Sequence, residues 1–155
     1  MPNHVQSVCL VLGSPSDIAA FKAAHIVEGN FDFNTVIPQP DSIKGTESST
    51  TSSLWFYALT GCFPDTGRFT PKILSDFGCV PRTVKTACEL EAWLQKNHPK
   101  EREKGERSIQ AYRETGHPSW YEWCIANWGT KWGAYQYHEQ AQTDNVLTFT
   151  FQTAW

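Results

Sequence analysis

Residues 146–155 read VLTFTFQTAW, and this stretch decides the fold class. Apolar and polar residues alternate from Leu147 to Gln152, with the period of two that a half-buried β-strand requires. Residues 132–138 predict a second strand, and Thr143-Asp144-Asn145 predicts the turn between the two. The sequence therefore predicts a C-terminal antiparallel hairpin with one face on a core.

The N-terminal part of the chain predicts a strand, a helix and a second strand. Residues 5–12 (VQSVCLVL) form a short apolar run with several β-branched residues, which indicates a buried strand. Ser14 is suited to cap a helix that follows with Pro15 in its first turn and continues to about Val27. Residues 31–37 (FDFNTVI) alternate and then become apolar, which predicts a strand that ends at Pro38.

The middle of the chain predicts less regular structure. Residues 42–53 are dominated by small polar side chains and predict a flexible loop. Residues 54–59 fit either a strand or a helical turn, and 83–97 predict a helix that Pro99 ends. The charged stretch 100–107, which contains Gly105, indicates a solvated helix or an exposed loop. Residues 108–115 continue it until Gly116, and a further helix is predicted from His117 to Ala126.

Composition predicts one compact α+β domain over residues 1–155. The apolar share of 40% and the aromatic share of 14% supply enough buried area for a core. The formal net charge of −3 disfavours non-specific nucleic-acid binding, which needs a basic surface. No basic region precedes a long apolar stretch, so the sequence predicts a cytoplasmic protein without a membrane span.

Candidate chemistry is sparse. The five cysteines are scattered without a Cys-x-x-Cys pair, and the five histidines lack metal-binding spacings, so neither a metal nor a cofactor is predicted. No nucleophile elbow, phosphate-binding loop or dinucleotide fingerprint is present, and no catalytic residue is assigned. A small enzyme that uses His4 with Asp32 remains an open alternative, because both residues lie near the ends of predicted strands.

The segment 120–132 contains four tryptophans and has two interpretations. The first is a core in which a helix packs on a sheet. The second is an aromatic platform for bases or for a protein partner. The binding residues of the platform would be Trp128, Lys131, Trp132 and Tyr135.

The folding interpretation assigns structural roles within and beyond this segment. A helix end followed at once by a strand leaves backbone groups without partners, which the short side chains of Asn127 and Thr130 can bond. Gly129 can take the positive φ of a tight turn, and Trp128 and Trp132 would fill the space between helix and sheet. The other structural residues are Trp120, Trp123 and Trp155.

These residues also carry a resemblance to a family. Trp120-Tyr121-Glu122-Trp123-Cys124, followed by Asn127-Trp128-Gly129-Thr130-Lys131-Trp132 and Tyr135, resembles the YubB-like ferredoxin-domain proteins of plasmids and phages. The opening Met1-Pro2-Asn3-His4-Val5, the stretch Phe31-Asp32-Phe33-Asn34 with Val36-Ile37-Pro38, and the ending Phe151-Gln152-Thr153-Ala154-Trp155 resemble the same family. Residues 42–116 do not take part. The resemblance implies a ferredoxin-like sheet packed on helices.

The chain also departs from the family pattern. Gly133 and Gln136 stand where the family commonly has Asn and Asp, which weakens any polar site there. The family usually continues beyond the Thr-Ala-Trp stretch with a further helix and strand. Without them we expect an exposed sheet face or edge, covered by the middle segment, by another copy in a homodimer, or by a target protein.

The expected function follows from this resemblance and from the lack of catalytic motifs. We expect a non-catalytic accessory protein of a phage or plasmid that binds a host protein in the host cytoplasm. Its target would be a defence complex, and the protein would inhibit CRISPR or restriction. Single-stranded nucleic-acid binding through an aromatic sheet face is the alternative from another class.

Overall fold

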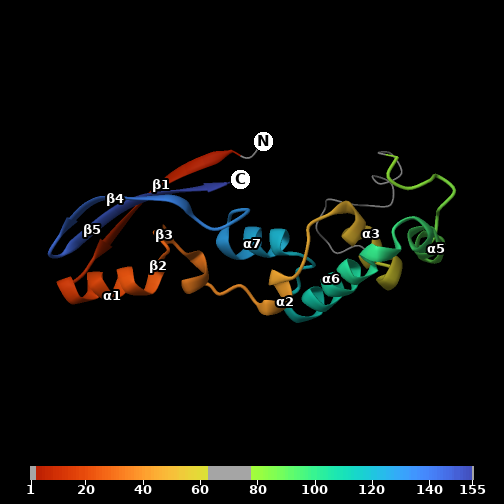
Figure 1. Ribbon diagram of the computed structural model, residues 1–155, viewed down its shortest axis with the longest axis horizontal. Helices are drawn as coiled ribbons and strands as arrows, with labels where there is room; N and C mark the ends of the chain where they lie inside the picture. The colour runs from red at the N-terminus through yellow and green to blue at the C-terminus, as the bar shows by residue number, and fades with distance from the viewer. Residues whose placement is uncertain (1–2, 63–77, 155) are drawn as a thin grey trace. The chain divides into compact units, whose positions relative to one another are not determined.

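The computed structural model describes residues 3–62 and 78–154 (Figure 1). Contacts along the chain group into two compact units, residues 1–39 with 124–155 and residues 40–123. The sequence predicts one domain over 1–155. Within the described residues, no helix has both the length and the apolar composition that a membrane span needs.

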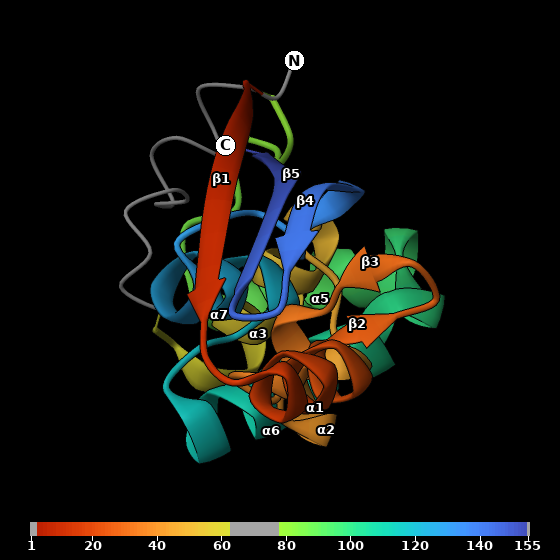
Figure 2. The same ribbon diagram turned by 90° about the vertical axis from the view of Figure 1, so that its left-hand side faces the viewer.

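The first unit is built on a three-stranded antiparallel sheet. Its strands are β1 (His4–Leu12), β4 (Tyr135–Thr143) and β5 (Val146–Ala154), in the order β1-β5-β4 (Figure 2). The predicted α+β class and C-terminal antiparallel hairpin are confirmed. The predicted start of β4 at Trp132 is wrong, because the strand begins at Tyr135. Its first residues are irregular: Gln136 has φ 53, and the register shifts between Tyr135 and His138.

One face of this sheet is covered by helix α1 (Pro15–His25), which follows β1 directly. Ser14 and Asp17 form a capping box at its start, as the predicted Ser14 cap requires. Ile18 packs on Leu147 and Phe149, and all three side chains are fully buried. The apolar row predicted for the last strand therefore forms the core of this unit.

The segment after α1 differs from its prediction. β2 (Ile26–Val27) and β3 (Asn30–Phe31) form a tight hairpin, whose turn residues Glu28 and Gly29 both have positive φ. A 3₁₀ turn, η1 (Phe33–Thr35), then replaces the strand predicted for 31–37. The Asp32 carboxylate accepts from the Asn34 amide at 2.9 Å, and the Thr35 hydroxyl donates to the Asp32 carbonyl. These local bonds favour a turn over a strand ladder.

The second unit is helical in its described part. Its elements are α2 (Asp41–Lys44), α3 (Thr50–Thr60), α5 (Ala87–Asn97), η2 (Pro99–Glu101), α6 (Arg102–Thr115) and the first residues of α7 (Trp120–Trp128). The loop predicted for 42–53 is wrong at both ends, since α2 and α3 occupy them. Ser49 and Ser52 form a capping box that starts α3, so these polar residues begin a helix. Residues 54–59 are helical.

The core of the second unit lies between α3 and α5. Its buried side chains are Leu54, Trp55, Ala58, Val80, Leu90 and Leu94. Helix α5 begins at Ala87 with Thr86 as its cap, four residues after the predicted start. Gly105 of α6 lies directly against α3, where an added Cβ would come within 2.4 Å of the Trp55 Cβ. Gly105 therefore marks a close helix crossing.

Candidate functional site

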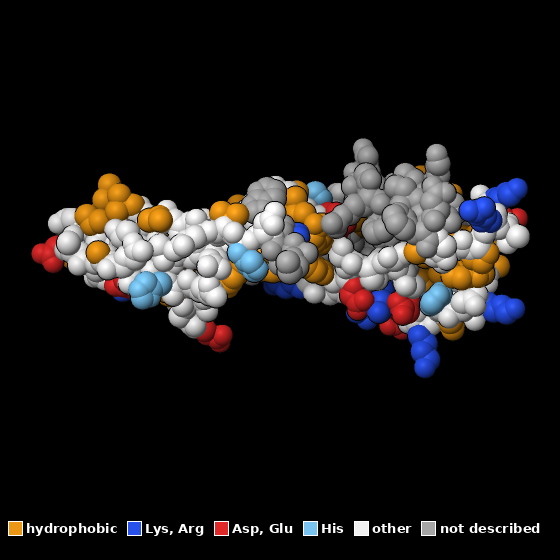
Figure 3. All heavy atoms as spheres, turned by 90° about the horizontal axis from the view of Figure 1, so that it is seen from above, with side chains coloured by type: hydrophobic (Ala, Val, Ile, Leu, Met, Phe, Trp, Pro, Cys, Tyr) orange, Lys and Arg blue, Asp and Glu red, His pale blue; other side chains and the backbone are white. Residues whose placement is uncertain are grey.

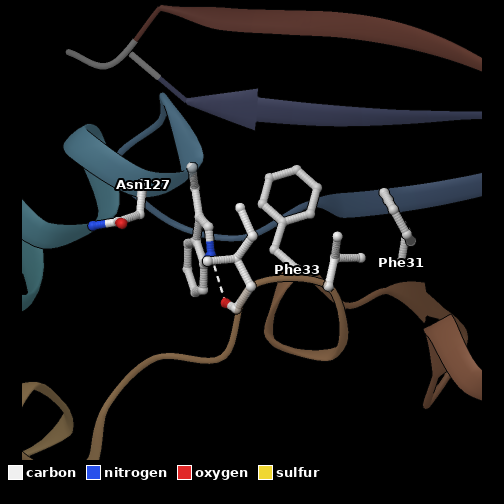
Figure 4. A pocket seen from close by; sticks show the side chains of 6 residues that line it. Phe31, Phe33 and Asn127 are labelled. Atoms are coloured by element: carbon white, nitrogen blue, oxygen red, sulfur yellow. Dashed lines mark hydrogen bonds between the residues drawn. The ribbon is translucent and has the colours of Figure 1, made fainter.

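An apolar pocket lies in the first unit, between η1 and the end of α7 (Figure 4). We call it the η1 pocket; its volume is about 210 Å³. The described residues that line it are Phe31, Phe33, Val36, Ile37, Asn127 and Trp128. Apart from the Asn127 amide, each of these side chains is aliphatic or aromatic, and none of the six is titratable.

The wall of the pocket is fixed by a hydrogen bond that joins two distant parts of the chain. The Trp128 indole Nε1–H donates to the Ile37 carbonyl at 3.0 Å, as the dashed line in Figure 4 shows. The Trp128 ring also meets Phe33 edge to face, with ring centroids 5.9 Å apart. Trp128 is anchored at both its polar and its apolar end, and these two contacts fix the position of this wall of the pocket.

A cluster of aromatic rings supports the pocket from behind. Phe33 packs edge to face on Phe31 at 5.5 Å and on Phe151 at 5.8 Å. Phe31 in turn contacts Phe149, a fully buried core residue of β5. These contacts connect the pocket floor to the sheet core, so ring positions are fixed before binding and little ordering entropy remains to be lost.

The outer end of the pocket is open to solvent and apolar. Val36 is 55% exposed and Ile37 is 42% exposed. Both follow η1 directly, where Pro38 prevents continuation of any helix. A ligand that covers these two side chains therefore gains hydrophobic burial at the rim in addition to the pocket itself.

Cys124 lies close in sequence to the pocket residues and is the candidate nucleophile of this region. Gln39 Nε2 donates to its sulfur at 3.5 Å. Burial raises the pKa of the Cys124 thiol to about 11, so the thiol is protonated at neutral pH. A protonated thiol is a poor nucleophile and a poor metal ligand, and Cys124 is a core residue.

A second surface of the first unit is the sheet face opposite α1. Val8, Leu10 and Leu12 of β1 point outward, opposite Thr150, Thr148 and Val146 of β5. Their exposed fractions are 68%, 58% and 68%. Figure 3 looks onto this side and shows hydrophobic side chains gathered near the end of the strands. We call these three residues the β1 row.

The predicted platform residues do not form one surface. Trp128 packs on Phe33, on the side of the sheet that carries Phe151. Tyr135 pairs with Gln152, whose side chain points to the opposite face, and its hydroxyl contacts His4 and the Thr153 carbonyl. A base-stacking row through Trp128 and Tyr135 is therefore not assembled.

The predicted turn after α7 has the expected geometry. Gly129 has φ 71, the positive value that a tight reversal needs. The buried Thr130 hydroxyl donates to the Ala154 carbonyl at 2.7 Å, and the Lys131 amide donates to the same carbonyl at 3.0 Å. These bonds tie the segment to the end of β5.

The tryptophans of this region divide by exposure. Trp123 is buried and Trp120 is half-buried, as structural roles require, whereas Trp132 is 41% exposed. The idea that Trp132 fills the interior between helix and sheet is wrong, because Trp132 precedes β4 and nearly half of it faces solvent. Asn127 lines the η1 pocket rather than serving the turn alone. Trp155 lies outside the described residues.

The alternative catalytic pair is not assembled. The His4 ring contacts the Tyr135 hydroxyl, while the Asp32 carboxylate accepts from the Asn34 amide. Among residues 3–62 and 78–154, no group of three or more His, Cys, Asp or Glu side chains is placed to hold a metal ion.

Sequence reasoning missed four residues of the pocket, which are Phe31, Phe33, Val36 and Ile37. The alternation of apolar and polar residues there predicts a strand instead. The signal that could have found them is Asp32-Phe33-Asn34-Thr35, since Asp followed by Asn and Thr favours local side-chain bonds to the backbone. A turn at that point directs Phe33 toward the core and leaves Val36 and Ile37 at the surface.

Comparison with known proteins gave no match: no family model, no curated protein and no solved structure is significantly similar to this chain.

Proposed function

We propose that this chain is a non-catalytic protein-binding module, and that the η1 pocket receives one aromatic or branched aliphatic side chain of a partner protein. The observation that carries the proposal is a preformed apolar pocket whose wall is fixed by the Trp128–Ile37 hydrogen bond. Pockets that accept a single anchor side chain are the usual energetic centres of protein interfaces.

The size and chemistry of the pocket select the class of ligand. At about 210 Å³ it is smaller than the roughly 300–1,000 Å³ of typical small-molecule sites. The described lining has no charged group, so neither a phosphate nor a carboxylate would be recognised.

The exposed rim extends the contact beyond the pocket. Val36 and Ile37 would be covered by the residues that flank the anchor, and their burial adds to the affinity. A partner segment of a few residues fits this arrangement better than a nucleic acid does, because the nearest candidate stacking residue on β4, Tyr135, faces the other side of the sheet.

The finer assignment rests on the family resemblance and is part of the proposal. A strand and helix followed by an antiparallel hairpin, whose second strand pairs with β1, is an arrangement found in ferredoxin-like sheets. This topology supports membership of the YubB-like group. The partner would then be a host protein, and we propose a component of a defence complex such as a CRISPR effector or a restriction enzyme.

Selection of binding peptides from a random library tests the site even though the partner is not identified. A library of displayed random peptides is selected on the protein and then on the variant Val36→Glu, with Val27→Glu as the matched control. Val27 is also exposed and lies outside the pocket. We expect enriched peptides that share one aromatic or branched aliphatic residue, that lose binding to Val36→Glu and that retain it to Val27→Glu.

Two results would contradict the proposal. One is a set of enriched peptides without a shared apolar anchor. The other is equal loss of binding in both variants, which would place the contact elsewhere. Circular dichroism and thermal melts of the two variants check that each remains folded.

A further inference from the structure

We propose that β1 pairs with β1 of a second copy of this chain, in antiparallel fashion about a two-fold axis. The chain would thus form a dimer with one continuous sheet. The inference rests on the free edge of β1, and it does not depend on the η1 pocket.

Within the described residues, the backbone of β1 presents unpaired groups at this edge. β1 is the outer strand of the sheet order β1-β5-β4 and pairs regularly with β5 from His4 to Leu12. The Gly13 amide donates to the Asn145 carbonyl at 3.2 Å, in continuation of the same register. Since the direction of N–H and C=O alternates along a strand, the groups of Val8, Leu10 and Leu12 point away from β5.

The residues of β1 itself lack the charges, prolines and bulges that protect an exposed edge. Its sequence, HVQSVCLVL, contains no Lys, Arg, Asp, Glu, Pro or Gly, and its pairing with β5 has no bulge. The other outer strand, β4, differs: it contains Glu139 and two register shifts. Proteins that keep an edge strand in water normally use charges, prolines or bulges to prevent pairing. β4 carries such features, whereas the residues of β1 leave its outer edge able to pair with another strand.

A second copy is the occupant that the residues of β1 favour. A strand edge carries both donors and acceptors, so it is self-complementary under a two-fold axis. Because β1 carries no charged carboxylate or ammonium group, pairing with itself brings no like charges together. An axis at Cys9 sets Cys9 opposite its own copy, and it sets Val8 of each copy opposite Leu10 of the other, so the two pairs that flank the axis are aliphatic.

Pairing also changes the environment of the β1 row. Val8, Leu10 and Leu12 are among the most exposed large apolar side chains described. In the dimer the two rows lie side by side on the same face of one sheet, and each shields the other from water. A dimer carries two linked η1 pockets and would therefore bind a bivalent partner with increased avidity.

Sedimentation equilibrium of the purified full chain tests the dimer, together with three variants. Val8→Pro removes an edge-directed N–H, a change that edge positions tolerate. Leu10→Lys places a charge in the row. Ala141→Lys is the matched control, since Ala141 is exposed on the opposite edge strand. We expect a dimer for the natural chain and for Ala141→Lys, and folded monomers for Val8→Pro and Leu10→Lys.

Hydrogen exchange separates edge pairing from any other mode of dimerisation. The amides of Val8 and Leu10 should be protected in the dimer and should exchange at least about tenfold faster in the Leu10→Lys monomer. A monomeric natural chain at all concentrations would overturn the proposal, and so would a dimer whose Val8 and Leu10 amides remain unprotected. Val8 and Leu10 lie outside the η1 pocket. Peptide binding by the Val8→Pro and Leu10→Lys monomers therefore tests the η1 pocket independently of the dimer.

Discussion

The crossing of α3 and α6 at Gly105 gives a quantitative prediction for Gly105→Ala. On helix propensity alone the change should stabilise the protein by about 1 kcal/mol, because Gly is a poor helix former. The structure predicts the opposite sign. An added Cβ would stand 2.4 Å from the Trp55 Cβ, 3.1 Å from the Trp55 carbonyl carbon and 3.2 Å from the Phe56 amide nitrogen.

None of these contacts is with the end of a flexible side chain. Two of the three atoms belong to the backbone of α3, so the helices must separate to admit the methyl group. Overpacking of this kind costs typically about 1–3 kcal/mol or more. Separation also disturbs Trp55, whose indole N–H donates to the His98 carbonyl at 3.1 Å. We therefore expect a net loss of about 1–3 kcal/mol in the free energy of unfolding.

Urea denaturation of Gly105→Ala measures this quantity, with far-ultraviolet circular dichroism and tryptophan fluorescence as two probes. Gln110→Ala is the matched control, since Gln110 is exposed on the same helix and tests propensity without the crossing. An unchanged or increased stability of Gly105→Ala would refute the close crossing of α3 and α6.

Two further predictions concern single side chains of the first unit. Trp132→Ala should lower the free energy of unfolding by only about 1–2 kcal/mol, because Trp132 is 41% exposed. Replacement of a buried Trp costs roughly 3–5 kcal/mol. A thermal melt measures the loss, and a loss of about 3–5 kcal/mol would mean that Trp132 is a core residue. Cys124 should resist alkylation by iodoacetamide at about pH 8 in the folded protein, since burial raises its pKa to about 11. Cys62 and Cys88 should be labelled, because both are exposed to the reagent. Mass spectrometry of the labelled peptides decides, and equal labelling of Cys124 would mean that its surroundings open readily.

The sequence predicted those parts of the fold in which one periodic pattern dominates. The alternation from Leu147 to Gln152 predicts a strand with one buried face, and β5 has this structure. The helix α1 also follows its prediction, because the Ser14 cap can be recognised in the sequence. A strand is found at β1 as predicted, but the prediction that this strand is buried is wrong, because β1 is an outer strand and Val8, Leu10 and Leu12 are exposed. The turn at Gly129 was predictable because positive φ and short polar side chains are local requirements.

The wrong predictions concern segments in which local side-chain bonds compete with the structure that the hydrophobic pattern predicts. Residues 31–37 alternate like a strand, but Asp32 bonds the following backbone and turns the chain into η1. Residues 49–53 look like a loop because serines and threonines serve loops and helix caps equally well. The turn at η1 has a local signal in the sequence, but the η1 pocket could not be foreseen, since no sequence pattern shows that residues 31–37 meet residues 127–128.

The most direct measurement of the central claim follows the Trp128 indole N–H by nuclear magnetic resonance during titration with N-acetyl-leucinamide and N-acetyl-phenylalaninamide. These probes carry one anchor side chain and two amides, and a single buried side chain supports binding in about the millimolar range or weaker. We expect a saturable shift of the Trp128 indole signal with either probe, absent with N-acetyl-glycinamide and lost in Val36→Glu. An indole signal that stays unmoved by both apolar probes, or that moves equally with the glycine control, would contradict a binding role for the η1 pocket.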